Sequence, residues 1–339
     1  MSLIPVSDPN VLVMGRSERA NGKLRIGYPG VTLRMRFEGS SLGLRVESSS
    51  ADSRFEVRVD TQPPRVVRVD AGQTDITLAE NLAKGAHSLE LVHRTETWQG
   101  IVSISGFRLE PGARLLPPEP FPARRLLVIG DSVTCGEAVE RSPDCQKNSD
   151  WWNPAQSYGM LLARVLGAQC HLVCYGGRGL IRDWQGRRDT LNAPAFFELA
   201  VPDPSAPARW NHDDYVPDVV LVSLGTNDFN LAIGALPERR EYVEAYVAFV
   251  RRIRACYPEA HVLLTEGAMV NDEADPKRPQ KRTLREYLAE TARRLADAKV
   301  HLVESRYYPG DPCDAHPTGQ QHQAMARDLT DEVRRVTGW

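Results

Sequence analysis

The apolar residues change their spacing once along the chain, near Pro111. Before that point they alternate with polar residues: in VTLRMRFE, Val31, Leu33, Met35 and Phe37 fall on one face of an extended chain. Gly, Pro, Ser and Asp interrupt such runs at short intervals, and no helical pattern lies between them. Residues 1–112 are therefore predicted to form many short, half-buried strands packed as an all-β sandwich of jelly-roll type.

Beyond that point the pattern changes. A proline-rich segment, residues 113–123, is predicted to be a stiff extended linker. Over residues 124–339 short apolar runs alternate with amphipathic stretches, which predicts a parallel sheet with helices on both faces. The predicted strands are 125–130, 171–174, 218–224, 261–265 and 299–303.

The amphipathic stretches predict helices between these strands. Two capping-box patterns, Thr283-x-x-Glu286 and Thr318-x-x-Gln321, are expected to mark helix starts. The apolar stripes are Tyr158, Leu161, Leu162 and Val165, then Tyr242, Tyr246, Phe249 and Ile253, then Leu284, Leu288 and Leu295, and last Met325, Leu329 and Val333.

Composition and charge exclude several classes of protein. The 42 basic and 44 acidic residues nearly balance, so neither nucleic acid nor an anionic membrane surface is indicated as a partner. No apolar run approaches the ~18 residues of a membrane span, and MSLIPVSDPNVLVMG lacks the charged start and long apolar core of a signal peptide. The six cysteines do not predict a disulfide framework: Cys135 and Cys145 are near enough in sequence to pair, whereas Cys170 and Cys174 are expected to pack as small apolar residues.

The first strand of the second half ends in Gly130-Asp131-Ser132. Because ligands of open parallel sheets bind beyond the carboxyl ends of the strands, the Ser132 hydroxyl is predicted to lie where a substrate would bind. Taken alone, the tripeptide is better explained as a turn followed by a helix N-cap, a position that Asp and Ser favour. The residues at the other strand ends are needed to distinguish a nucleophile from a helix cap.

Three further segments bring polar groups to the same edge of the predicted sheet. Asn227 follows one strand, Gly177 follows another and can let a backbone N–H approach a ligand, and His316 lies in the loop before the last helix. Each alone is explained as well by a turn, an ordinary glycine or a solvated histidine. Together they supply acyl transfer, with Ser132 as nucleophile, His316 as base, and an oxyanion hole made by the N–H groups of Ser132 and Gly177 and the Asn227 amide. This chemistry needs neither a metal nor a cofactor.

These segments resemble the SGNH (GDSL-type) hydrolase superfamily over residues 124–339, with Ser132, Gly177, Asn227 and His316 at its four named positions. The resemblance implies an α/β/α sandwich. The whole chain resembles carbohydrate esterase family 2, which joins an N-terminal β jelly roll to a C-terminal SGNH domain. The stretches that carry this resemblance are DPNVLVMGR, YPGVTLRMRFEGSSLGLRVE, IGDSVTCG, SYGMLLAR, GGRGL and PDVVLVSLGTNDF.

The family resemblance implies an activity and a compartment. The activity is removal of O-acetyl groups from xylan, glucomannan or sugars, with a preference for the 6-hydroxyl of hexoses, through an acyl-enzyme on Ser132. The compartment is secreted or periplasmic, which conflicts with the missing signal peptide and leaves the localisation open. The partner is then an acetylated carbohydrate, and the oligomeric state stays undetermined.

The position of the acid that would orient His316 differs from the common SGNH pattern. Most members carry it three residues before the histidine, where this chain has Cys313. Asp314 lies two residues before, a spacing that the esterase family shares, and Asp311 is a second candidate. On extended backbone an offset of two returns a side chain to the same face, so Asp314 can reach His316 Nδ1 if the loop curls. Some family members lack the acid, so a Ser132–His316 dyad with a solvated Asp314 stays open.

Two clusters remain. Trp151 and Trp152, in NSDWWNPAQS, are candidates to stack on a sugar, although structural tryptophans explain them equally. The stretch NHDDY, residues 211–215, is interpreted as a solvated turn and not as a metal site.

Two other functions stay open. An SGNH lipase or thioesterase shares the chemistry, although no amphipathic lid is visible in the sequence. A non-catalytic carbohydrate-binding protein is the other alternative, and the joint presence of Ser132, Asn227 and His316 argues against it.

Overall fold

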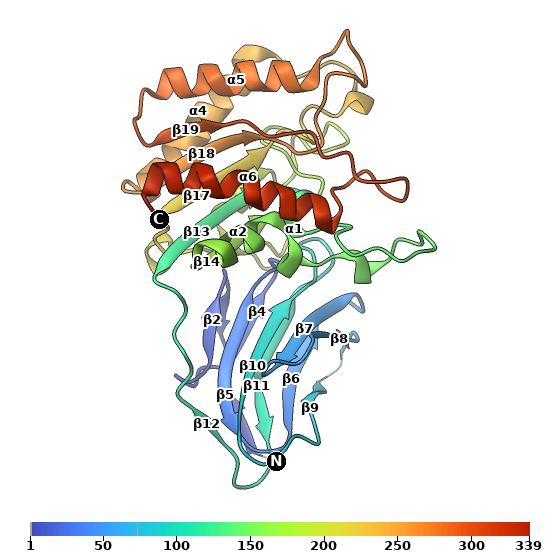
Figure 1. Cartoon of the computed structure of the whole chain (residues 1–339), viewed down its shortest axis with the longest axis vertical. Coiled ribbons are helices and arrows are strands. Elements are labelled where there is room, and N and C mark those ends of the chain that lie inside the picture. Colours follow the sequence, from blue (N-terminus) through green and yellow to red (C-terminus); the bar gives the residue numbers. More distant parts are fainter. Residues whose placement is uncertain (1, 73) are drawn as a thin grey trace. The chain divides into compact units, whose positions relative to one another are not determined.

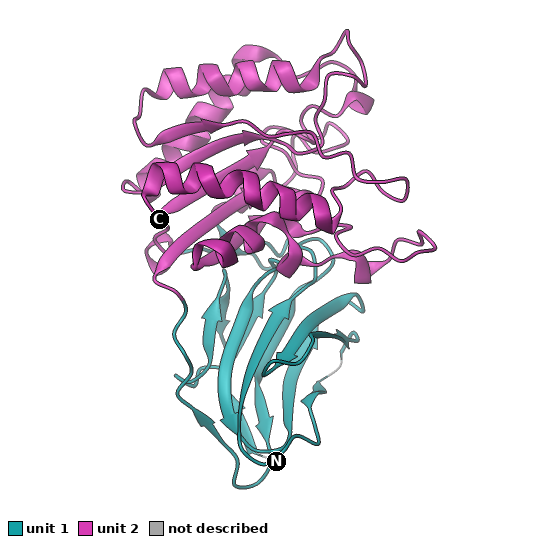
Figure 2. Cartoon of the chain, in the orientation of Figure 1, with its two compact units in different colours: residues 1–121, 199–210 teal, residues 122–198, 211–339 magenta. Residues whose placement is uncertain are grey.

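The computed structural model describes residues 2–72 and 74–339 (Figure 1). The chain divides into two compact units, residues 1–121 with 199–210, and residues 122–198 with 211–339 (Figure 2). The short segment 199–210 thus groups with the first unit although it lies in the second half of the sequence. The domain boundaries predicted from the change of apolar spacing, residues 1–112, 113–123 and 124–339, stay a prediction.

The first unit is built from two antiparallel sheets. Its strands are β1 Ser2–Pro5, β2 Leu12–Met14, β3 Glu18–Ala20, β4 Lys23–Ile26, β5 Thr32–Glu38, β6 Leu42–Ser48, β7 Ser53–Val59, β8 Arg65–Val69, β9 Asp75–Ala79, β10 Ala86–His93, β11 Val102–Leu109 and β12 Arg114–Leu116. One sheet has the order β3-β4-β11-β6-β9 with β1 beside β11, and the other has the order β12-β5-β10-β7-β8 with β2 beside β5. In β5 the alternating residues Leu33, Met35 and Phe37 are buried, as predicted.

Two segments outside the predicted β domain, residues 1–112, also form strands of this unit. Part of the expected linker is β12, which pairs with β5 through Arg114 opposite Glu38. The segment 199–210 forms a hairpin of β15 Leu199–Val201 and β16 Ala208–Arg209. Arg16 anchors it by donating to the Leu199 carbonyl at 3.0 Å and by lying over the Trp210 ring.

The second unit is a five-stranded parallel sheet with helices on both faces. Its strands are β13 Arg124–Gly130, β14 Ala168–Cys174, β17 Val219–Leu224, β18 His261–Glu266 and β19 Val300–Val303. They lie in the order β14-β13-β17-β18-β19, and all neighbouring pairs are parallel. All five coincide with the predicted strands, although β14 begins earlier than predicted. The predicted fold class, a β sandwich followed by a helix-covered parallel sheet, is confirmed.

The helices of this unit are α1 Ser132–Cys135, α2 Tyr158–Leu166, α3 Ala193–Phe196, α4 Arg239–Cys256, α5 Gln280–Leu295 and α6 Gly319–Thr337. Helices α2 and α6 pack with Leu126 and Val128 of β13 on one face of the sheet, and α4 and α5 pack together on the other (Figure 1). Short 3₁₀ turns lie at Ser149–Trp151, Pro154–Gln156, His212–Asp214 and Leu231–Ile233. Over the described ranges, no helix is both long enough and apolar enough to cross a membrane.

Two helix predictions need correction. The capping box at Thr318 is confirmed, but α5 begins earlier than Thr283, with Pro279 at its N-cap. No helix breaker separates Pro279 from Thr283, so the helix extends back to the proline, and the Thr283 hydroxyl donates to the Pro279 carbonyl at 2.6 Å. In α2, Val165 is 58% exposed, because the buried face of that helix is formed by its neighbours Leu162 and Leu166.

The cysteines also differ from expectation. Disulfides join Cys135 to Cys174 and Cys145 to Cys313. Cys135 and Cys145 therefore do not pair with each other, and Cys174 is not merely an apolar packing residue. The reason is topological: β13 and β14 are parallel neighbours that end at the same edge, so Cys135, just after β13, meets Cys174 at the end of β14. Cys170 is buried, as expected.

Candidate active site

Ser132 is the first residue of α1, two residues after the end of strand β13. The N-cap is Asp131, whose carboxylate accepts from the Val133 N–H at 3.1 Å. The Ser132 hydroxyl instead lies 2.9 Å from His316 Nε2. The helix cap is therefore Asp131 and not Ser132, and the role of Ser132 as nucleophile stays a prediction. Gly130 is required, since a Cβ there would lie 2.0 Å from Thr134 Oγ1.

Asp314 lies on the other side of the His316 ring. Its Oδ1 is 2.6 Å from His316 Nδ1 and also accepts from the His316 backbone N–H at 2.8 Å. A carboxylate can only accept, so Nδ1 carries the proton and Nε2 is left to accept from Ser132. Burial acts to raise the pKa of Asp314, but hydrogen bonds from His316 and Lys147 outweigh it and hold the pKa well below its ordinary value.

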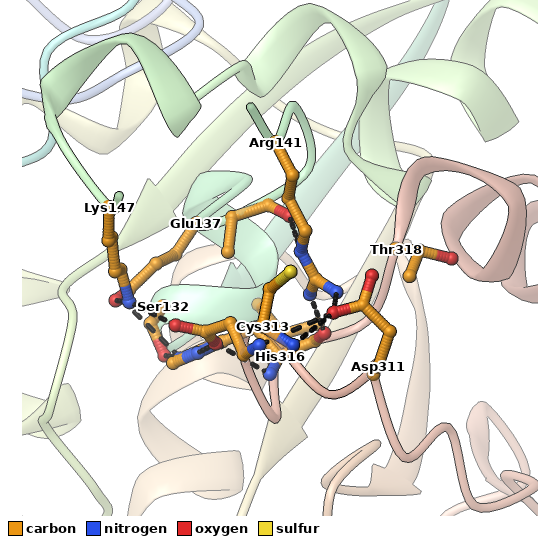
Figure 3. A network of polar contacts seen from close by, with 12 residues as sticks. Ser132, Glu137, Arg141, Lys147, Asp311, Cys313, His316 and Thr318 are labelled. Carbon is orange, nitrogen blue, oxygen red and sulfur yellow. Dashed lines mark hydrogen bonds and ion pairs between the residues drawn. The ribbon is translucent and has the colours of Figure 1, made fainter. Parts of the chain in front are cut away.

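The loop that carries Asp314 curls, as the spacing required. Backbone hydrogen bonds in both directions close Asp311 on Asp314, at 3.0 and 3.2 Å. The Asp311 carboxylate pairs with Arg141, so this second candidate acid is not the partner of the His316 ring. Arg141 also donates to the His316 carbonyl, and therefore holds the loop at both Asp311 and His316 (Figure 3).

The predicted oxyanion donors lie at the ends of β13, β14 and β17. Within residues 2–72 and 74–339, the backbone N–H groups of Ser132 and Gly177 have no hydrogen-bond acceptor in the protein. The Asn227 amide nitrogen donates to the Arg178 carbonyl at 2.9 Å and lies 3.4 Å from Asp131 Oδ2. Asn227 is thus tied to the loop that carries Gly177. Burial raises the pKa of Asp131 to about 6.

A buried carboxylate next to Asn227 fixes the same loop. Asp228 accepts from the backbone N–H groups of Leu180, Ile181 and Arg182, at 2.8, 2.8 and 3.2 Å. The Arg182 guanidinium in turn donates to the Asp228 carbonyl. Gly177 has φ +72°, a left-handed conformation that favours glycine. The sequence pattern did not indicate Asp228, although it follows Asn227 directly.

The tryptophans require a correction. Trp151 and Trp152 are only 2% and 6% exposed and pack with Ala138 and Cys313. Burial argues against the predicted stacking role, because a buried ring has no free face for a sugar. Trp184 is 53% exposed, and its backbone N–H donates to the Gly177 carbonyl at 2.9 Å. A Cβ on Gly177 would lie 2.6 Å from its ring, so this exposed aromatic borders the predicted oxyanion site.

The stretch at His212 is a 3₁₀ turn whose histidine is held by the protein. His212 Nδ1 lies 2.7 Å from the Tyr257 hydroxyl and Nε2 lies 3.4 Å from Glu198. In the part of the chain that the structure describes, no group of three or more His, Cys, Asp or Glu side chains is placed to hold a metal ion.

Two family models match the chain. The model "Carbohydrate esterase 2 N-terminal" matches residues 13–119, and the model "GDSL-like Lipase/Acylhydrolase family" matches residues 128–331. Among curated proteins, an acetylxylan esterase / glucomannan deacetylase of Cellvibrio japonicus is 41% identical over 99% of this chain and 91% of its own length. The cellulase/esterase CelE of Acetivibrio thermocellus is 32% identical, over 84% of this chain and 34% of its own length.

Solved structures agree with these matches. A family two carbohydrate esterase from Cellvibrio japonicus superposes with a TM-score of 0.94 at 41% identity, covering 100% of this chain and 98% of its own. A family two carbohydrate esterase from Clostridium thermocellum, in complex with cellohexaose, superposes with a TM-score of 0.86 at 28% identity, covering 97% and 99%. The GDSL-like family model covers most of the second unit, and the Cellvibrio japonicus esterase is similar over nearly its whole length. These matches show that the chain is a carboxylic ester hydrolase that belongs to carbohydrate esterase family 2.

Proposed function

We propose that this esterase removes O-acetyl groups from carbohydrates through an acetyl-enzyme formed on Ser132. The observation that carries the proposal is the continuous set of hydrogen bonds from Ser132 through His316 to Asp314. The names of the relatives, an acetylxylan esterase / glucomannan deacetylase and esterases of family two, support an acetylated polysaccharide as substrate. The proposed position of attack is the 6-O-acetyl group of a hexose, as the family resemblance implies.

The reaction starts at Ser132. Its oxygen attacks the acetyl carbonyl carbon while His316 Nε2 accepts the hydroxyl proton. The imidazolium is stabilised by Asp314 on Nδ1, and then gives its proton to the sugar oxygen as the C–O bond of the ester breaks. Water next attacks the acetyl-enzyme by the same proton transfers in turn, which releases acetate and restores the Ser132 hydroxyl.

The developing oxyanion needs donors that are already in place. The N–H groups of Ser132 and Gly177, which lack protein acceptors among the described residues, are the first two in the proposal. The Asn227 amide is the third. One of its two hydrogens bonds to the Arg178 carbonyl, and the other makes only a long hydrogen bond, 3.4 Å between the amide nitrogen and Asp131 Oδ2, which the oxyanion would replace. Asp228 supports the site indirectly, because it holds the loop after Gly177.

The sugar needs a surface of its own. Trp184 is exposed and borders Gly177, so its ring is suitably placed to stack on the pyranose that carries the acetyl group. Trp184→Ala is then expected to raise KM for an acetylated polysaccharide and to leave turnover of nitrophenyl acetate nearly unchanged.

The function is tested by measuring acetate release from acetylated xylan, acetylated glucomannan and acetylated monosaccharides. On each substrate, release by the wild-type protein is compared with release by the Ser132→Ala variant. Release that depends on Ser132 is expected. A series of nitrophenyl esters of increasing acyl length separates the lipase alternative: an acetyl esterase should lose activity as the chain grows. Preference for long acyl chains, or acetate release unaffected by Ser132→Ala, would contradict the proposal.

A further inference from the structure

Two carboxylates flank the ring of His316, and one lysine joins them (Figure 3). Asp314 contacts Nδ1, while Glu137 Oε2 lies 3.5 Å from Nε2, the nitrogen that also meets Ser132. Lys147 Nζ is 2.6 Å from Glu137 Oε1 and 2.7 Å from Asp314 Oδ2. No sequence motif marks this cluster, whose members come from two loops far apart in the chain.

The contacts differ from an ordinary surface ion pair. The side chains of Glu137 and Asp314 are only 14% and 12% exposed, and that of Lys147 is 32% exposed. The ammonium also lies 5.3 Å from the centre of the buried Trp152 ring. Burial acts to lower the pKa of Lys147, but attraction to Glu137 and the hydrogen bond to Asp314 outweigh it and raise the pKa. Lys147 is therefore charged, and shared between the two carboxylates.

The loops do not depend on this lysine to stay together. Cys145 and Cys313 form a disulfide between the same two segments, two residues before Lys147 and one residue before Asp314. Arg141 forms a second tie through Asp311 and the His316 carbonyl. With the backbone held in two other ways, the remaining effect of Lys147 is on the orientation and charge of the carboxylates.

We propose that Lys147 is a positioning residue of the active site, which holds Asp314 and Glu137 against His316 and offsets their charge so that the histidine is neutral when Ser132 attacks. The inference rests on the function proposed above. Two carboxylates beside one imidazole both favour its protonated form, and a protonated His316 cannot accept the Ser132 proton. A cation touching both carboxylates reduces that preference without removing either one.

Other titratable groups also face His316. They are the same residues in wild type and in each variant, although Asp131, whose pKa burial raises to about 6, itself changes charge in this pH range. Arg141 lies behind its carbonyl and is paired with Asp311. Asp131 is buried beside Ser132. His322 is fully buried, and burial lowers its pKa to about 3, so it is neutral where the enzyme is assayed. The groups that face His316 from all sides are Asp131, Glu137, Arg141, Lys147, Asp311, Asp314 and His322.

The test is the acidic limb of kcat/KM for nitrophenyl acetate in Lys147→Met, with Lys147→Arg as the charge-preserving control. Lys147→Met removes the cation but keeps an apolar stem, so the limb is expected to move to higher pH by about 0.5–1 unit. Lys147→Arg should restore most of the wild-type profile. A change of KM below about twofold would accompany this, since the lysine acts through His316 and not on the substrate.

Glu137→Gln provides a second, opposite measurement. Removing that negative charge should move the limb to lower pH by a similar amount, and the double variant should lie close to wild type. A purely structural role cannot produce shifts of opposite sign that cancel. Each limb is measured on protein whose circular dichroism and melting temperature are recorded, and Glu137→Gln keeps the test available if Lys147→Met does not fold.

Two results separate failure of this inference from failure of the function. If Ser132→Ala keeps wild-type turnover, the proposed mechanism is wrong, whatever the limbs do. If Ser132→Ala is inactive but the limb stays in place in folded Lys147→Met, or in Glu137→Gln, then Lys147 is only a structural tie and the inference is overturned.

Discussion

At the scale of single residues, neighbouring side chains divide tasks that either could perform. Asp131 caps α1 while Ser132, one residue later, contacts His316. Asp311 pairs with Arg141 while Asp314, three residues later, contacts the imidazole. In both pairs the backbone turn decides which side chain points to the site.

Ser132→Ala should abolish ester hydrolysis and leave the fold intact. Loss of the nucleophile from such a unit costs ~10⁶ in kcat, measured with nitrophenyl acetate. His316→Ala should cost a similar factor, and the double variant little more than either one, because the two residues act in the same step. Losses that multiply in the double variant would count against their coupling.

Asp314→Asn separates a triad from a dyad. An amide at this position can donate to Nδ1, which favours the wrong tautomer, so kcat should fall by ~10⁴. Asp311→Asn is the matched control: its carboxylate contacts Arg141 and not the ring, so its loss of kcat should be far smaller. A loss below about tenfold in Asp314→Asn would favour a Ser132–His316 dyad.

Asn227→Ala tests the oxyanion hole. We expect kcat to fall by about 10²–10³ with little change in KM, because the amide meets the charged oxygen only in the transition state. The variant also loses the bond to the Arg178 carbonyl, so its melting temperature has to be recorded beside its kinetics. Raised KM with normal kcat would instead make Asn227 a substrate-binding residue.

At the scale of elements, the loop after β14 is held to the end of β17 by a buried carboxylate. Asp228 accepts three backbone N–H groups of that loop and is fully buried. Such a contact orders a segment that has neither helix nor strand geometry. The site thus depends on a loop whose conformation comes from a side chain of another strand end.

Asp228→Asn should therefore destabilise the protein. An amide NH₂ in place of one carboxylate oxygen faces an N–H donor, so a buried donor is left unsatisfied, at a cost of about 1–3 kcal/mol. Urea unfolding measures the change, and Asp189→Asn, at an exposed position of the same stretch, should stay within about 0.5 kcal/mol of wild type. Equal stabilities for the two variants would contradict the anchoring role.

At the scale of the whole molecule, disulfides join parts of the second unit that are far apart in the sequence. Cys145 and Cys313 are 168 residues apart in sequence, and their disulfide joins the loop of Lys147 to the loop of Asp314 and His316. A cross-link over so long a loop restricts the unfolded chain strongly.

Replacing both Cys145 and Cys313 with Ser should lower the free energy of unfolding by about 2–4 kcal/mol. It should also lower kcat, because the Asp314 loop loses one of its ties. Cys256→Ser, outside both disulfides, is the matched control and should change neither quantity much. Unchanged stability in the double variant, measured without reductant, would mean that this bond contributes little.

Much of the fold could be predicted because its signal is local. Alternation with period two indicated β5, and short apolar runs located all five strands of the parallel sheet. The positions of Ser132, Gly177, Asn227 and His316 followed, since parallel strands present their carboxyl ends at one edge. The start of α5 and the strand β12 were missed, because helix ends and edge pairings depend on a few residues whose propensities are weak.

The sequence by itself thus determined the two architectures and the strand ends at which acyl-transfer chemistry would lie. Only the tertiary structure decided which acid meets His316, that Lys147 joins Asp314 to Glu137, that Trp184 and not Trp151 or Trp152 is exposed, and which cysteines pair. The physical reason is range. Periodicity and capping arise from residues within a few positions of each other, whereas these contacts join segments far apart in the chain, whose meeting depends on strand order and on how the loops curl.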